Sequence, residues 1–229
     1  MKYNELFDHI KHMENWIETG SDIDWVTEID HDRKIIRLLF KESDSKLDWF
    51  HNLAYFSKVY KKQTSVLIAH HGFANAYKTA NDVIMTTLIR LANEFPEYKV
   101  VIAGWSNGGA SAQLAAEDYN YRTRSDKANV NTGRKAILVT FGAPKVFVGK
   151  KCRNYVLSCC EKVIQVANRN DIVTYLPPFP WFKHVLLSVK LRVGDKFSII
   201  KIFNPWKYHT MYDQIDLYKV DGPLGNEEV

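Results

Sequence analysis

A sharp turn between a buried strand and a small-residue helix constrains the fold of this chain more than any other feature. Lys99–Ala103 is a short, continuous, β-branched run, which predicts a buried strand. The tight turn Gly104-Trp105-Ser106-Asn107-Gly108-Gly109 follows, and then the alanine-rich helix Ala110–Asp118. In a Gly-x-Ser-x-Gly turn, the glycines let strand and helix approach closely, and the serine takes a strained backbone conformation at the end of the strand. The pattern predicts that Ser106 is a nucleophile beside a helix N-terminus.

Ser106 also has a simpler interpretation. Serine is a good N-cap residue, so it could merely begin the helix. A Gly-x-Ser-x-Gly pattern also arises by chance in roughly two or three of a hundred sequences of this composition. The nucleophile turn requires a strand before it and a helix after it, and both are expected here. We therefore prefer the nucleophile interpretation.

Strands and helices alternate along much of the chain, which predicts an α/β fold with a mostly parallel central sheet flanked by helices. No linker or repeat divides residues 1–229, so we expect one domain. The further strands expected are Asp24–Ile29, Lys34–Phe40, Thr64–His70, Ala136–Phe141 and Lys162–Ala167. The further helices expected lie within residues 1–20, 74–95, 150–160 and 211–218. Beyond Pro177 the pattern indicates an antiparallel hairpin of Val185–Val193 and Phe197–Phe203.

Composition excludes several classes of protein. With 46% apolar and 25% charged residues, wholesale disorder and collagen-like structure are ruled out. No apolar run reaches the ~18 residues of a membrane span, and no signal peptide is visible. The three cysteines, bunched between residues 152 and 160, have neither disulfide-framework nor metal-ligand spacing. We expect a reducing, cytoplasmic location, with export by another route left open, and neither a metal nor an organic cofactor.

The net charge of +5 is too mild to indicate a nucleic-acid partner. It would suit a weak, transient attraction to an anionic lipid surface. Oligomeric state is left open by the sequence.

A serine nucleophile needs a general base, and that base needs an acid to fix its tautomer. In this type of fold the order along the chain is serine, acid, histidine. The best-placed acid is Asp171, directly after the strand Lys162–Ala167, although an aspartate there could also be a turn or cap residue. Two histidines follow, His184 and His209. We prefer His209, which begins the last helix, because His184 opens an apolar strand and is expected to be a structural hydrogen-bonding residue.

Five motifs, in order along most of the chain, resemble those of the class 3 lipases, the fungal-lipase-like branch of the α/β-hydrolases. They are Phe40–Leu53, His71–Phe73 with Ala76-Tyr77, Gly104–Ala115, Thr140–Pro144, and Asn170–Val173 with Leu176-Pro177-Pro178. The resemblance implies that Asp171 is the triad acid and that the later histidine, His209, is the base. It also implies an oxyanion hole formed by the backbone N–H groups of Ser43 and Asn107, with the Ser43 hydroxyl as a third donor.

The chain departs from the family pattern around the nucleophile and the oxyanion segment. Trp105 stands where the family usually has histidine, and Asn107 where it usually has leucine. Lys41 and Glu42 replace an arginine and a glycine. A carboxylate aimed inward would oppose the developing oxyanion, so Glu42 should face solvent or a basic partner.

The resemblance also implies a lid, which we place at residues 53–62; a plain surface helix is the alternative. Together these features predict a serine hydrolase that cleaves carboxylic esters through an acyl-enzyme, a triacylglycerol lipase-like enzyme or a phospholipase acting on a lipid. Acyl transfer or thioester hydrolysis on a soluble substrate is a rival of the same class. The alternative of a different class is a non-catalytic hydrolase-fold module that binds a lipid or a protein.

Overall fold

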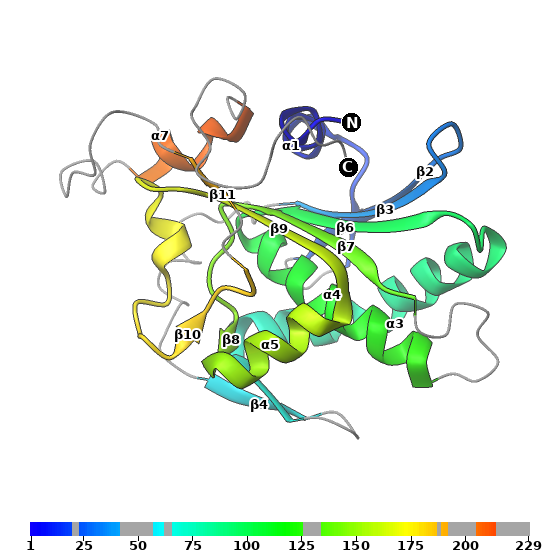
Figure 1. Cartoon of the computed structure of the whole chain (residues 1–229). Coiled ribbons are helices and arrows are strands. Elements are labelled where there is room, and N and C mark those ends of the chain that lie inside the picture. The colour runs from blue at the N-terminus through cyan, green and yellow to red at the C-terminus, as the bar shows by residue number, and fades with distance from the viewer. Residues whose placement is uncertain are drawn as a thin grey trace.

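The computed structural model describes residues 1–19, 23–41, 57–61, 66–125, 134–186, 189–191 and 205–213. Their strands form two sheets (Figure 1). The larger has the order β1-β2-β3-β6-β7-β9-β11, in which the pairs β1–β2 and β2–β3 are antiparallel and the remaining pairs are parallel. Its strands are Ile17–Glu18, Asp24–Asp30, Ile35–Phe40, Lys99–Trp105, Ala136–Phe141, Cys160–Asn168 and Val189–Leu191. The predicted mostly parallel α/β sheet is therefore confirmed.

Helices cover both faces of the larger sheet. On one face lie α3 (His71–Glu94), α4 (Asn107–Ser125) and α5 (Gly149–Cys159); on the other lie α1 (Tyr3–His12) and α7 (Pro205–His209) (Figure 1). Successive side chains of a strand point to opposite faces. The central strands are accordingly apolar on both faces, and two separate cores form.

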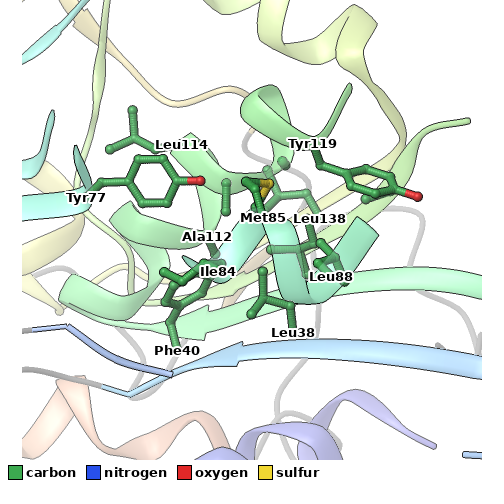
Figure 2. Packing of buried hydrophobic residues seen from close by; sticks show 14 of the residues in the cluster. Leu38, Phe40, Tyr77, Ile84, Met85, Leu88, Ala112, Leu114, Tyr119 and Leu138 are labelled. Carbon is green, nitrogen blue, oxygen red and sulfur yellow. The ribbon is translucent and has the colours of Figure 1, made fainter. Parts of the chain in front are cut away.

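The larger core lies between the sheet, α3 and α4 (Figure 2). Leu38 and Phe40 of β3 contribute from the sheet, while Tyr77 and Leu88 of α3 pack against them from above. The small residues of α4, such as Ala112, let that helix lie close to the strands. This close packing fixes the position of the β6–α4 turn at the carboxyl end of β6.

The expected helix of residues 1–20 is shorter in the structure. Helix α1 ends at His12, Met13 takes an extended conformation, and Ile17 and Glu18 pair with β2 instead. The Trp16 indole N–H donates to the Met13 carbonyl at 2.8 Å, which satisfies one of the acceptors left at the helix end. The apolar spacing that continues to Ile17 was therefore misleading, and this side chain is exposed.

The strand expected at Thr64–His70 is present as β5 (Val66–His70), but it lies in a second, antiparallel sheet of order β10-β8-β5-β4. The other strands of this sheet are Phe182–Lys183, Phe147–Val148 and Ser57–Lys61. Because β5 runs directly into α3 at His71, it belongs to the crossover that joins parallel strands β3 and β6.

Within the first half of the expected hairpin after Pro177, Val189–Leu191 forms β11, which joins the larger sheet parallel to β9 and not antiparallel to it. The pairing between the two halves of the hairpin stays a prediction. Phe197–Phe203 lies outside the described residues. Of the predicted lid, 53–62, only Ser57–Lys61 is described, and it forms the edge strand β4. None of the described helices is long and apolar enough to cross a membrane.

Candidate active site

The turn between β6 and α4 holds Ser106 in a strained conformation. Its φ is 56°, in the left-handed region that residues other than glycine rarely adopt, and only 5% of its surface is exposed. Two hydrogen bonds fix the turn: the Ser106 N–H donates to the Phe141 carbonyl at 2.9 Å, and the Gly109 N–H donates to the Ser106 carbonyl at 3.0 Å. The serine therefore sits at the carboxyl end of β6, before the first turn of α4, as a nucleophile turn requires.

The flanking glycines are required by close backbone contacts. A Cβ on Gly104 would lie 2.3 Å from the Gly108 carbonyl oxygen, and one on Gly108 would lie 2.3 Å from the Lys41 carbonyl oxygen. The second contact places the end of β3 against the N-terminus of α4, where Asn107 is the first residue. Glu42 and Ser43 lie outside the described residues, but Lys41, which precedes them, is thus beside the serine turn.

Asp171 is a fully buried carboxylate in the loop that follows β9. Its backbone N–H donates to the Asn168 carbonyl at 3.1 Å. Its Oδ1 accepts the Val173 N–H at 3.0 Å, so it caps η1 (Ile172–Tyr175), a single 3₁₀ turn. The capping role considered from the sequence is therefore real. It occupies only one carboxylate oxygen.

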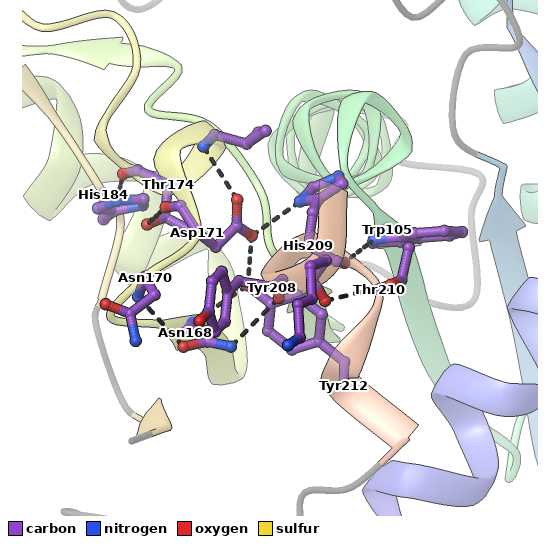
Figure 3. Close-up of polar contacts among 12 residues, drawn as sticks. Trp105, Asn168, Asn170, Asp171, Thr174, His184, Tyr208, His209, Thr210 and Tyr212 are labelled. Carbon is purple, nitrogen blue, oxygen red and sulfur yellow. Dashed lines mark hydrogen bonds and ion pairs between the residues drawn. The ribbon is translucent and has the colours of Figure 1, made fainter. Parts of the chain in front are cut away.

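The other oxygen of Asp171 pairs with His209, the last residue of α7 (Figure 3). The distance from His209 Nδ1 to Asp171 Oδ2 is 2.7 Å, and neither side chain is exposed. Two residues 38 positions apart in the sequence are thus brought together as a buried acid–base pair. A hydrogen bond of this kind fixes the imidazole ring and its tautomer.

Tyr212 supplies a second donor to the same oxygen, and sequence analysis missed it. Its hydroxyl donates to Asp171 Oδ2 at 2.6 Å and accepts the Asn168 N–H at 3.1 Å (Figure 3). Complete burial raises the pKa of Tyr212 well above its usual value, and the negative charge of Asp171 raises it further. The phenol therefore stays protonated and keeps donating. The sequence signal for this role was its position three residues after His209, in the next helical turn, which keeps its side chain close to the histidine.

Trp105, the residue before Ser106, contacts His209 directly. Its indole N–H donates to the His209 carbonyl at 3.1 Å, and the two rings lie 5.6 Å apart. Phe7 of α1 packs edge-on against the indole, with the ring centroids 5.2 Å apart. The N-terminal helix thus contacts the residue that holds His209. The departure from the family's usual histidine at this position therefore has a structural use, which the sequence did not reveal.

The serine turn and the acid–base pair converge at residues 141 and 142. Phe141 accepts the Ser106 N–H, and Gly142, with φ at 56°, comes directly after it. A Cβ on Gly142 would lie 2.8 Å from Asp171 Oδ2 and 3.0 Å from His209 Cε1. Ser106, Asp171 and His209 therefore gather at one place, beyond the carboxyl ends of β6, β7 and β9.

His184 lies apart from this convergence. Its Nε2 is hydrogen-bonded to the Thr174 carbonyl at 2.7 Å, which is the structural use expected from the sequence. Within the described part of the chain, no cluster of three or more histidine, cysteine or acidic side chains could hold a metal ion.

Comparison with known proteins identifies the family. The profile of the class 3 lipases matches residues 37–181. A lipase of Rhizomucor miehei is 30% identical over 145 residues, covering 63% of this chain and 38% of the relative. The chain thus spans less than half the length of that relative.

Solved structures share the fold. The Rhizomucor miehei lipase in complex with its propeptide superimposes with a TM-score of 0.65 at 26% identity, covering 78% of this chain and 55% of that one. A triacylglycerol lipase whose catalytic centre is formed by a serine protease triad gives a TM-score of 0.65 at 27% identity, covering 79% of this chain and 66% of that one. The chain belongs to the class 3 lipase family and has the α/β-hydrolase fold.

Proposed function

We propose that this protein hydrolyses carboxylic esters of lipids with a catalytic triad of Ser106, His209 and Asp171. The observation that carries the proposal is the buried hydrogen bond from His209 Nδ1 to Asp171 Oδ2, 2.7 Å long, at the edge of the sheet where the strained turn holds Ser106. Membership of the class 3 lipases and the triad of a similar triacylglycerol lipase support the same assignment.

The arrangement suits acyl transfer to a serine. With the Nδ1 proton of His209 held by Asp171, Nε2 is the basic nitrogen and takes the proton of Ser106 as Oγ attacks the ester carbonyl. The imidazolium then gives that proton to the leaving alkoxide, the carbonyl–alkoxide bond breaks, and an acyl-enzyme remains. Water attacks the acyl-enzyme with His209 again as base, which releases the carboxylic acid and restores the serine.

The oxyanion formed in each step needs donors, and we assign them to the backbone N–H groups of Asn107 and Ser43, with the Ser43 hydroxyl as a third. The first N–H groups of a helix have no acceptor within it, and Asn107 begins α4. The contact between Lys41 and Gly108 supports bringing the Ser43 segment to the same place. Each such donor is worth about a hundred- to a thousandfold in rate.

The relatives support a substrate class. A secreted mono- and diacylglycerol lipase of Malassezia globosa is 31% identical over 124 residues, covering 54% of this chain and 36% of the relative. We therefore place acylglycerols or phospholipids ahead of soluble esters. The expected lid at residues 53–62 is not part of this proposal, because Ser57–Lys61 is the edge strand β4, hydrogen-bonded to β5. Activity that rises once the substrate exceeds its solubility limit would distinguish a lipase from an esterase.

The compartment is a separate part of the proposal. The three cysteines are buried and form no disulfide, and burial raises the pKa of the Cys160 thiol to about 12. These thiols support a reducing, cytoplasmic location, whereas the Malassezia globosa relative is secreted. Fractionation of cells that express the chain with its native ends, probed by antibody, decides between the two.

The test is turnover of p-nitrophenyl esters from short to long acyl chains, by the native protein and by Ser106→Ala. Loss of a triad serine should lower kcat by a thousandfold or more, commonly about a millionfold. The preferred chain length then separates an esterase from a lipase. If native protein and variant are equally slow on every ester, the hydrolase proposal fails and a non-catalytic binding module takes its place.

A further inference from the structure

A stacked aromatic pair beside α5 has one exposed member, Trp181, and one partly buried member, Phe179. Phe179 and Trp181 stack with ring centroids 4.6 Å apart and planes 10° from parallel, and 47% of Trp181 is exposed. The backbone beneath is fixed: the Phe182 N–H closes a turn onto the Phe179 carbonyl at 3.2 Å, and the Gly149 N–H donates to the Trp181 carbonyl at 2.7 Å. An exposed tryptophan ordered in this way has apolar area to offer to a partner rather than to its own core.

A basic groove begins at the same turn. It encloses about 450 Å³ and is lined by the cationic Lys145, Arg153 and Lys183, with His184, and by apolar residues that include Pro180 of the aromatic turn. None of the described residues that line it is acidic. A second hollow, of about 280 Å³, adjoins it by sharing Lys145 and His184, and the described part of its lining is likewise without an acidic residue.

The cations of this groove are not neutralised within the described part of the chain. Lys145 Nζ donates to the Tyr175 carbonyl at 2.7 Å, a neutral partner, and burial together with the charge of Lys183 lowers its pKa. Arg153 Nε is buried and has no hydrogen-bond partner among the described residues. A buried donor without an acceptor costs free energy, which a bound anion would recover.

The first turn of α5 strengthens the same positive field. Lys150 and Lys151 are exposed there, Arg153 follows, and the turn contains no acidic residue. Helices generally favour negative side chains at this end, because the macrodipole is positive there. Basic residues in the first turn of α5 therefore lower the stability of the helix, and such a cost is expected at a surface that serves binding.

We propose that Phe179, Trp181, Lys145, Arg153 and Lys183 form a docking face for an anionic phospholipid membrane. The cations bind lipid phosphates, and the aromatic pair enters the interface between headgroups and acyl chains, where tryptophan is favoured. β10, which carries Lys183, and α5, which carries Arg153, lie side by side below the η1 turn that follows Asp171 (Figure 1). The inference rests on the proposed function in one respect: the docking face would keep the proposed active site close to its lipid substrate.

Vesicle sedimentation tests the docking face without any turnover. All variants are made in the Ser106→Ala background, so that the vesicles stay intact. Binding is measured to vesicles of phosphatidylcholine alone and to vesicles of phosphatidylcholine mixed with phosphatidylglycerol, whose anionic headgroups give the surface a negative potential. The variants are Arg153→Glu and Lys183→Glu, each alone and both together, and Trp181→Ala. The matched control is Lys99→Glu, which reverses the charge of an exposed lysine at the N-terminal end of β6, the end away from the Ser106 turn.

The anionic vesicles should bind at least tenfold more tightly than the neutral ones. The double charge reversal should weaken that binding about thirtyfold or more, since two basic contacts are lost. Trp181→Ala should weaken binding to both kinds of vesicle, and Lys99→Glu should change it less than twofold. Thermal unfolding checks that each variant is folded.

Equal binding of the native surface to the two kinds of vesicle would overturn the proposal. It would also be overturned if Lys99→Glu weakened binding to the anionic vesicles as much as Arg153→Glu or Lys183→Glu alone. The second result would mean that net charge alone attracts the protein. Failure of ester hydrolysis in the native protein would remove the proposed function but leave these binding results unchanged, so the two failures are distinguishable.

Discussion

Replacing Tyr212 with phenylalanine tests whether the pair of Asp171 and His209 is tuned for catalysis. Asp171 accepts three described hydrogen bonds: from Val173 on Oδ1, and from His209 and Tyr212 on Oδ2. The substitution keeps the ring and removes the 2.6 Å bond, the shortest of the three. A hydrogen bond to a charged group is worth about 1.5–3 kcal/mol. In the proposed mechanism, the imidazolium of the transition state depends on this carboxylate, so kcat should fall about 10- to 150-fold.

The assay is kcat and KM for p-nitrophenyl butyrate, together with the free energy of unfolding in urea. The variant also leaves the Asn168 N–H without its tyrosine acceptor, so some loss of stability is expected whatever the role of Tyr212. A lower kcat at nearly constant KM is the catalytic signature. A loss of stability with kcat changed less than twofold would refute the reasoning and leave Tyr212 a purely structural residue.

Three further substitutions probe the same region and the sheet behind it. Trp105→Phe removes the 3.1 Å bond to the His209 carbonyl, and kcat should fall about fivefold because a neutral hydrogen bond is worth about 1 kcal/mol; an unchanged kcat would mean that the ring alone positions the histidine. Gly142→Ala places a Cβ 3.0 Å from His209 at φ 56°, so the free energy of unfolding in urea should drop by at least about 1–2 kcal/mol, and a stability equal to native would contradict the contact. The hydrogen bond from Arg37 holds the pKa of Asp30 well below its usual value, with a smaller contribution from the Arg33 N–H. A lowered pKa stabilises the fold above the unfolded value of about 4, and this stabilisation is lost as pH falls through the folded pKa. Asp30→Asn should therefore lower Tm at pH 7, with a difference from native that narrows below about pH 4; a difference independent of pH would count against the ion pair.

The local signals in the sequence predicted the elements that position the site. The β-branched runs at β6 and β7 and the glycine turn at Ser106 depend on interactions within a few residues, and the structure has them where they were expected. The order of serine, acid and histidine left two histidines, and the expectation that His184 is structural, with the family resemblance, favoured His209. The structure brings Asp171 and His209 together, although their catalytic roles stay predictions.

The contributions that the sequence did not reveal depend on contacts between distant segments. Nothing local to Trp105 shows that its indole meets a carbonyl 104 residues further on, and nothing local to Tyr212 shows that its hydroxyl reaches Asp171. Helix α1 is shorter than its apolar spacing suggests, and Ile17 pairs with β2 in the sheet instead. Strand β11 pairs parallel to β9, a partner more than 20 residues earlier in the chain. Periodicity indicates which face of a segment is buried but does not identify its partner.

The most direct measurement of the central claim is covalent labelling by a fluorophosphonate, read by mass spectrometry of the digested protein. A serine activated by His209 attacks phosphorus and displaces fluoride, whereas an ordinary buried serine does not react. We predict one adduct, on the peptide that contains Ser106, lost in His209→Ala as well as in Ser106→Ala. An unlabelled native protein, or a label on another serine that survives in His209→Ala, would contradict the triad.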